Sequence, residues 1–62
     1  MKKYLRYIKN TNGHATKAAF IEDWEPIGNM VWNDLLNADL ATLNMTGYVV
    51  LTPKGEAKLE EN

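Results

Sequence analysis

The chain contains no cysteine and no serine, and its only histidine is His14. Without cysteine, the protein has no disulfide and no thiolate ligands for zinc. The absence of serine and cysteine also removes the usual nucleophiles of covalent catalysis, and His14 stands in a predicted loop with no obvious partner to orient it. We therefore expect neither an enzyme nor a cofactor or metal site.

Long apolar runs are also missing. No segment approaches the ~20 residues that span a membrane, and none has the flanks of a secretory signal, so we expect a cytoplasmic protein without a membrane partner. The 62 residues are enough for one domain, residues 1–62. A chain of this size buries only about 60% of the surface of its unfolded form. Such domains often depend on a disulfide, a metal or a partner subunit, and we expect a homodimer.

The charges are few and unevenly distributed, with a net charge of −1. Residues 1–20 have no acidic member but contain the basic residues Lys2, Lys3, Arg6, Lys9 and Lys17. Residues 21–62 are acidic overall and contain only two lysines, Lys54 and Lys58. Such asymmetry is typical of a basic face that contacts phosphate, of attraction between copies, or of two ordinary solvated faces.

Helical periodicity dominates the first two thirds of the chain. The spacing of apolar residues predicts helices over residues 2–10, 17–24 and 27–37. The first helix should end at residues 10–13, where Asn and Gly tolerate left-handed backbone, and Thr16 should cap the second. The expected core positions of the three helices are Met1, Tyr4, Leu5 and Ile8; Phe20, Ile21 and Trp24; and Ile27, Met30 or Val31, Leu35 and Ala38.

The last third predicts a hairpin and a final helix. Residues 40–43 and 48–51 have the composition of short strands, and residues 44–47 form the turn between them, with Gly47 able to adopt a positive φ. Thr52 followed by Pro53 is typical of a helix start, and this helix should run to about residue 60 and dock through Ala57 and Leu59. The predicted fold is mainly α with a two-stranded β-hairpin, in the order α-α-α-β-β-α.

This order, together with the run Leu51-Thr52-Pro53-Lys54-Gly55 after a strand, resembles the winged helix-turn-helix superfamily of small bacterial, archaeal and phage DNA-binding proteins. The run is similar to the "strand, Leu-Thr-x-x-Gly, helix" ending of MarR-like and PadR-like regulators. The resemblance implies a transcriptional regulator that binds double-stranded DNA, with helix 27–37 in the major groove and hairpin 40–51 as the wing.

The resemblance also implies which side chains would meet DNA. Helix 27–37 would present Asn29, Trp32, Asn33 and Asn37 to the groove, where an Asn amide can pair bidentately with adenine. The wing tip would present Asn44, Met45 and Thr46, and the basic contacts would come from Lys17 and Lys54.

A second hypothesis is a winged-helix module that binds protein and has no direct role with nucleic acid. Helix 27–37 contains no Arg or Lys, its one charged residue is Asp34, and the wing tip is neutral. Phosphate contacts supply much of the affinity of DNA complexes, so this surface also suits a protein partner. Trp24 is expected in the core. Three locations are open for Trp32: the core, a dimer surface, or an exposed position beside DNA.

Overall fold

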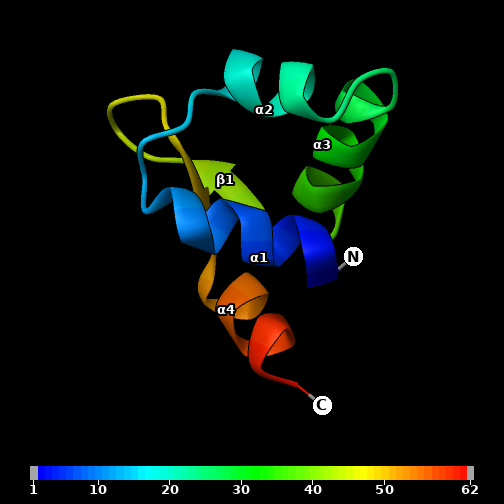
Figure 1. Ribbon diagram of the computed structural model, residues 1–62. Coiled ribbons are helices and arrows are strands. Elements are labelled where there is room, and N and C mark those ends of the chain that lie inside the picture. The colour runs from blue at the N-terminus through cyan, green and yellow to red at the C-terminus, as the bar shows by residue number, and fades with distance from the viewer. Residues whose placement is uncertain (1, 62) are drawn as a thin grey trace.

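The computed structural model describes residues 2–61 and confirms the predicted mainly α fold with its hairpin. The elements follow one another as α1 (Lys2–Thr11), α2 (Lys17–Asp23), α3 (Gly28–Asn37), β1 (Ala41–Leu43), β2 (Val49–Leu51) and α4 (Pro53–Glu60). In Figure 1, α1 crosses the middle of the molecule in front of the hairpin, with α2 above it and α4 below. Helix α3 forms one side of the molecule, and the turn of the hairpin protrudes on the other.

Helix α1 buries the apolar side that its sequence predicts. Tyr4, Leu5 and Ile8 are buried, while the expected core residue Met1 lies outside the described residues. The helix ends where Asn12 and Gly13 adopt positive φ angles of 54° and 77°. Left-handed backbone at these positions stops the helix, as predicted.

Both predicted threonine caps are present. The hydroxyl oxygen of Thr16 accepts a hydrogen bond from the backbone N–H of Ala19 at 3.1 Å, which begins α2. The hydroxyl oxygen of Thr52 accepts from the backbone N–H of Gly55 at 3.0 Å, and Pro53 is the first residue of α4. Each cap satisfies a backbone donor that has no partner within the first turn of a helix.

Helix α3 is turned about its axis relative to the prediction. Val31 and Leu35 are buried as expected, but Ile27 and Met30 are 42% and 57% exposed, and Trp32 is buried in their place. Ile27 is the N-cap residue of α3 and precedes its first helical turn, so it lies outside the buried stripe of the helix. The large indole of Trp32 takes the space against Phe20 of α2, with ring centroids 5.9 Å apart.

The hairpin is held by backbone pairing on both sides of β2. Strand β1 pairs with β2 in antiparallel register, with Thr42 opposite Val50. On the other side, Thr16 forms an isolated antiparallel bridge with Tyr48, and the N–H of Val49 donates to the carbonyl oxygen of Ala15 at 2.8 Å. The sequence did not predict this third segment, because a pairing of so few residues leaves no alternating pattern.

Helix α4 docks through its backbone as well as through Leu59. A Cβ added at Gly55 would lie 2.0 Å from the carbonyl oxygen of Leu40, so only glycine permits this approach. Leu59 packs partly buried against the core, but Ala57 is exposed, and its predicted docking role is wrong. Because Gly55 permits the close approach to Leu40, α4 contacts the rest of the molecule near its first turn, and Ala57 points away from this contact.

The core itself is small and aromatic. Its buried hydrophobic residues come from every element except α4, and they are Tyr4, Leu5, Ile8, Phe20, Val31, Trp32, Leu35, Leu40, Ala41 and Val49. Trp24 lies at its edge, half-buried, with its ring 4.7 Å from that of Tyr4. Within residues 2–61, no helix has the length and apolar character needed to cross a membrane.

Candidate nucleic-acid interface

Helices α2 and α3 follow one another with a short connection between them. Four residues, from Trp24 to Ile27, separate the two helices, and α3 then runs in a different direction from α2 (Figure 1). A Cβ added at Gly28 would lie 2.2 Å from the carbonyl oxygen of Ile21, so the start of α3 touches the backbone of α2. Helix α3 is thereby fixed as an outer helix, with one side buried against α2 and the hairpin.

The outward side of α3 is a face of amides. Asn29, Asn33 and Asn37 are all exposed, and Met30 lies among them. At about 100° per residue, Asn33, Asn37 and Met30 point most directly away from the buried side. Asn29 lies about 80° from Asn37, toward one flank of the helix. The predicted asparagine row therefore exists as an exposed surface, which we call the amide face (Asn29, Met30, Asn33 and Asn37).

The side-chain amides of this face are free. None of Asn29, Asn33 and Asn37 forms a side-chain hydrogen bond with residues 2–61. Asparagine costs up to about 0.7 kcal/mol relative to alanine in a helix interior, where Asn33 lies, while Asn29 and Asn37 are at the two ends of α3. These residues neither cap α3 nor fill its core, so their contribution to folding does not account for them.

Trp32 does not belong to this surface. Its predicted place on the groove side is wrong, because only 2% of it is exposed and its ring packs edge-on against Phe20. The sequence offered both possibilities, since Trp32 lies beside the asparagines along the chain. Its position on the helix excludes DNA contact, because Trp32 lies on the inner side of α3 together with the buried residues Gly28 and Leu35.

The predicted wing residues lie on the other side of the molecule. In Figure 1 the hairpin turn containing Asn44 and Thr46 and the helix α3 occupy opposite sides. The amide of Asn44 is engaged: its Oδ1 accepts from the backbone N–H groups of Thr46 and Tyr48, each at 3.0 Å, and from the Thr46 hydroxyl at 2.8 Å. Lys17 follows Thr16, which is bridged to Tyr48, so Lys17 belongs to this end and not to the amide face.

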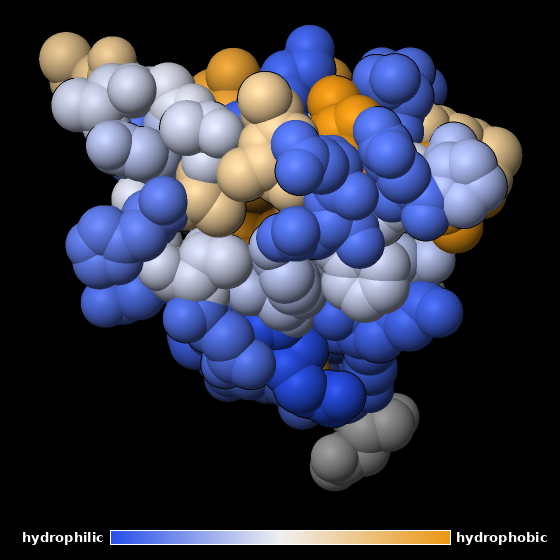
Figure 2. Space-filling model, turned by 45° about the horizontal axis from the view of Figure 1, so that its top comes forward, coloured by the Kyte–Doolittle hydropathy of each residue, from blue (hydrophilic) through white to orange (hydrophobic). Residues whose placement is uncertain are grey.

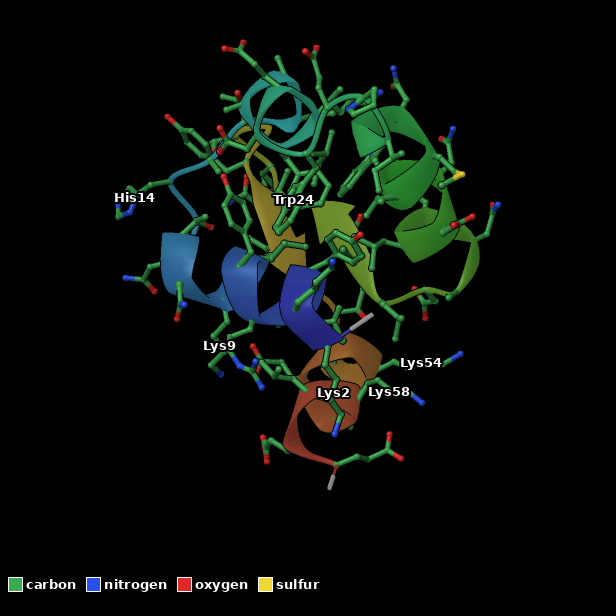
Figure 3. All side chains as sticks on the ribbon, turned by 45° about the vertical axis from the view of Figure 1, so that its right-hand side comes forward. Lys2, Lys9, His14, Trp24, Lys54 and Lys58 are labelled. Carbon is green, nitrogen blue, oxygen red and sulfur yellow. The ribbon has the colours of Figure 1, made fainter. Side chains whose placement is uncertain are left out.

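Lys54, in contrast, is held near the end of α3. It precedes Gly55, whose backbone contacts Leu40 directly after α3. The backbone N–H of Thr52 also donates to the carbonyl oxygen of Leu40 at 3.1 Å. Figure 3 shows Lys54 leaving α4 on the side of the molecule where α3 lies above it. Of the two lysines predicted to contact DNA, Lys54 is therefore the one that can act together with the amide face.

Most other cations are occupied by neighbours. Lys9 forms an ion pair with Glu56 at 2.5 Å, and Lys58 approaches Glu61 at 3.7 Å. The ammonium of Lys3 lies over the ring of Tyr4, 5.1 Å from its centroid. In Figure 2 the part of the surface over α1 and α4 is mainly hydrophilic, whereas hydrophobic residues appear in small separate areas higher up. The basic first helix is thus partly neutralised by the acids of α4.

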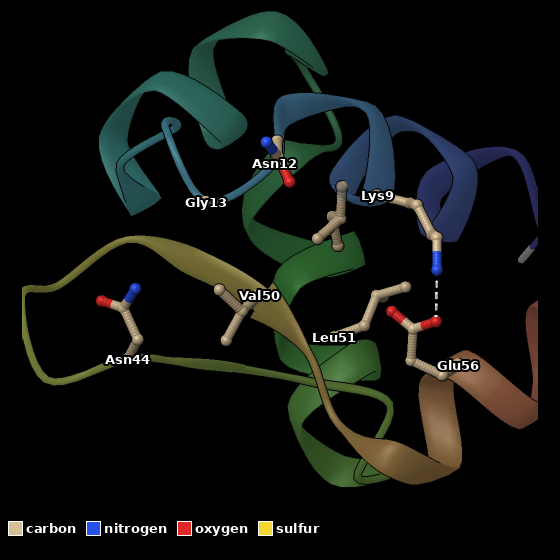
Figure 4. Close-up of a pocket in the computed structure, with 8 residues that line it drawn as sticks. Lys9, Asn12, Gly13, Asn44, Val50, Leu51 and Glu56 are labelled. Atoms are coloured by element: carbon tan, nitrogen blue, oxygen red, sulfur yellow. Dashed lines mark hydrogen bonds and ion pairs between the residues drawn. The ribbon is translucent and has the colours of Figure 1, made fainter.

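A shallow pocket of about 440 Å³ lies between the end of α1, the hairpin and α4. Figure 4 shows it closed at one end by the Lys9–Glu56 ion pair, with Val50 and Leu51 along the strand and Asn44 toward the turn. Its lining mixes one pair of opposite charges with a few apolar side chains. Among residues 2–61, no group of three potential ligand side chains is placed to hold a metal ion.

Comparison of the chain with models of protein families, with curated proteins and with solved structures finds no match. We therefore infer function from the fold and the surface alone. The sequence predicted the exposed row of three asparagines that forms the amide face. It missed Met30 as an exposed member of the face, because the same helical spacing also fits a core position.

Proposed function

We propose that the protein is a winged helix-turn-helix DNA-binding protein, acts as a homodimer in transcriptional regulation, and inserts α3 into the major groove. The amide face carries this proposal: three exposed asparagines without internal hydrogen bonds lie on the outer helix of a helix-turn-helix. In this motif the second helix enters the major groove with its exposed side chains toward the base edges.

The arrangement around β2 also supports the winged-helix assignment. The short bridge between Thr16 and Tyr48 places the α1–α2 connection beside β2, so that β2 lies between two paired segments. A hairpin anchored on both sides is rigid at its base. The turn itself is neutral, and we assign it no base contact because the Asn44 amide is already bonded.

Phosphate contact must come from outside α3, which has no cation. Lys54 is the basic residue best placed for it, because the Gly55 contact fixes the start of α4 near the end of α3. With so few cations on this side, we expect weak non-specific binding and a small salt slope, since each neutralised phosphate adds about 0.9 to the slope.

The competing function is a protein-binding helix, and Met30 is the observation that favours it. An exposed methionine at the edge of a face that has no cation, about 40° from the exposed Asp34, suits a protein partner. However, the other exposed apolar residues of this region, Ile27 and Leu36, lie about 180° apart around the helix. Ile27 lies about 60° from Met30 and can adjoin it, but Leu36 lies about 120° from Met30, so the apolar patch is limited to two side chains.

The test is fluorescence anisotropy of a labelled mixed-sequence duplex titrated with protein at about 50 and 200 mM salt. We expect weak binding at the lower salt, and a further loss of about 3- to 4-fold at the higher salt for each phosphate that the protein neutralises. Replacement Lys54→Gln should reduce the salt slope by about 1. Lys17→Gln removes the same charge at the opposite end of the molecule and should leave the slope unchanged.

Absence of binding at the lower salt would reject DNA binding and favour the protein-interaction module. An equal loss of slope in Lys54→Gln and Lys17→Gln would instead reject α3 and α4 as the DNA-facing side.

A further inference from the structure

We infer that Asn33 and Asn37 each read one adenine in the major groove, that the two adenines are separated by one base pair, and that Met30 packs on a thymine methyl beside them. This inference rests on the proposed DNA-binding function and specifies which base pairs the surface recognises.

The orientation of α3 selects these residues. Asn33 and Asn37 are both exposed and differ by only about 40° around the helix, close to the direction opposite the buried Trp32 and Leu35. Asn29 is also exposed but lies on the flank, about 80° from Asn37. Asn29 lies about 40° from Asn33 on the side away from Asn37, so when Asn33 and Asn37 face the bases Asn29 is turned about 60° from that direction.

The distance between the two amides sets the spacing of the bases. Four helical residues rise about 6 Å along the axis, and two base steps rise about 6.8 Å along the duplex. A helix lying along the groove therefore places the two amides at base pairs with one pair between them. Lys54, held near the C-terminal end of α3, adds a positive charge for phosphate beyond Asn37.

The chemistry of a free carboxamide fits adenine. Its NH₂ group donates to adenine N7, and its oxygen accepts from the N6 amino group. Both atoms must be free for this pairing, and in Asn33 and Asn37 both are, since neither amide is bonded to residues 2–61. In Asn44 the oxygen already accepts three hydrogen bonds.

Met30 completes an A·T pair by apolar contact. Its side chain is 57% exposed and lies about 60° from Asn33 around the helix, on the side of Asn37. An apolar side chain in this position can contact the C5 methyl of the thymine that pairs with adenine. Adenine edge and thymine methyl would then be read by adjacent residues of one helix.

The experiment begins with selection from a duplex pool with a randomised centre, using the complete chain. We expect enriched sequences to share two adenines separated by one base pair. In the enriched duplex, 7-deazaadenine at either position removes the N7 acceptor and should weaken binding by about 5- to 150-fold. Deoxyuridine in place of the paired thymine removes only the methyl and should weaken the wild type but not Met30→Ala.

Three asparagine-to-alanine variants test the assignment, two at the proposed base-reading residues and one as a matched control. Asn33→Ala and Asn37→Ala should each lose the preference at one adenine while keeping their affinity for the unselected pool. Asn29→Ala should keep both preferences. All three replace an exposed helical asparagine by a better helix former, so none should unfold the protein.

The outcomes separate this inference from the proposed function. Salt-sensitive binding without any enriched sequence, or with enrichment that 7-deazaadenine does not affect, would overturn the adenine reading and leave DNA binding intact. Loss of preference in Asn29→Ala alone would also overturn it. No binding to the pool at about 50 mM salt would reject the proposed function and the inference together.

Discussion

Asparagine has three different tasks in this protein, and the backbone around each residue decides between them. Asn12 ends α1 with a positive φ of 54°, a conformation that asparagine tolerates better than most residues. Asn44 uses its side-chain oxygen to close the hairpin turn. Asn33 and Asn37 do neither, because helical backbone directs them outward from α3. The sequence predicted that Asn12 ends a helix, that Asn44 lies in a turn and that Asn33 and Asn37 belong to one row along a helix. These predictions hold because each depends only on residues close by in the chain.

Tyr7 provides a test at the scale of a single hydroxyl. It donates a hydrogen bond to the carboxylate of Asp23, and this bond, with partial burial and the charge of Asp23, raises the pKa of Tyr7 to about 12. In the unfolded chain the tyrosine loses its proton near 10. Between these two values the folded state keeps a proton that the unfolded state has released, so stability must fall as pH rises from 10 to 12.

We expect Tyr7→Phe to lower the free energy of unfolding by about 1 kcal/mol near pH 7, through loss of the hydrogen bond. The variant should also show a smaller loss of stability between pH 10 and 12 than the wild type. Urea unfolding across this pH range measures both effects. Tyr48→Phe is the control, because the Tyr48 hydroxyl has no hydrogen-bond partner within residues 2–61. Identical pH dependence in Tyr7→Phe and wild type would contradict the Tyr7–Asp23 assignment.

At the scale of elements, the contact between α2 and α3 depends on Gly28. A Cβ there would lie 2.2 Å from the backbone oxygen of Ile21 and 2.7 Å from its Cα, and backbone atoms cannot move aside as a flexible side chain can. We expect Gly28→Ala to destabilise the protein by about 1–3 kcal/mol, although alanine favours helix by up to about 1 kcal/mol. The neighbouring replacement Asn29→Ala adds no clash and should be neutral or slightly stabilising.

Chemical denaturation with circular dichroism compares the two variants. If Gly28→Ala were as stable as Asn29→Ala, the close approach of α2 and α3 would be incorrect. A variant that remains folded but loses DNA binding would show that the crossing of the two helices also positions the amide face.

The elements themselves were largely predictable, whereas their relative placement was not. Each helix and strand begins and ends within one or two residues of its predicted range, because caps, glycines and apolar periodicity are local signals. The rotation of α3 about its axis was not predictable, because the helical spacing allows either Met30 or Trp32 in the core. The contact of Trp32 with Phe20 of α2 decides between them, and the sequence does not show this contact. The separation of the hairpin turn from α3 depends on the direction in which the hairpin leaves the core, and no local spacing determines it. The exposure of the asparagines was therefore predicted correctly and the exposure of Trp32 was not, whereas the DNA contacts of Lys17, Lys54 and the turn stay predictions.

At the scale of the whole molecule, the small size and the few free cations limit the affinity that one copy would have for DNA under the proposed function. Within residues 2–61 the core contains ten buried hydrophobic side chains, and the amide face has no cation of its own. A single copy measures 28 × 24 × 20 Å, less than the 34–36 Å of one helical turn of DNA. Two copies can therefore occupy half-sites one turn apart on the same side of the duplex without overlapping. A homodimer would contact DNA through two α3 helices and would gain affinity that the single Lys54 of one copy cannot supply.

The homodimer proposal predicts a dependence of binding on half-site spacing. Two copies of the selected site placed about 10 base pairs apart, centre to centre, should bind the protein cooperatively. Moving them to about 15 base pairs apart turns the second site to the opposite side of the duplex, and the cooperativity should disappear. Anisotropy titrations of the two duplexes measure this difference, and sedimentation of the free protein over a range of concentrations shows whether a dimer forms without DNA. A monomer at all concentrations that binds both duplexes equally well would contradict the proposal. Cooperative binding by a chain that is monomeric in solution would instead show that the two copies associate on DNA, where the half-sites hold them close together.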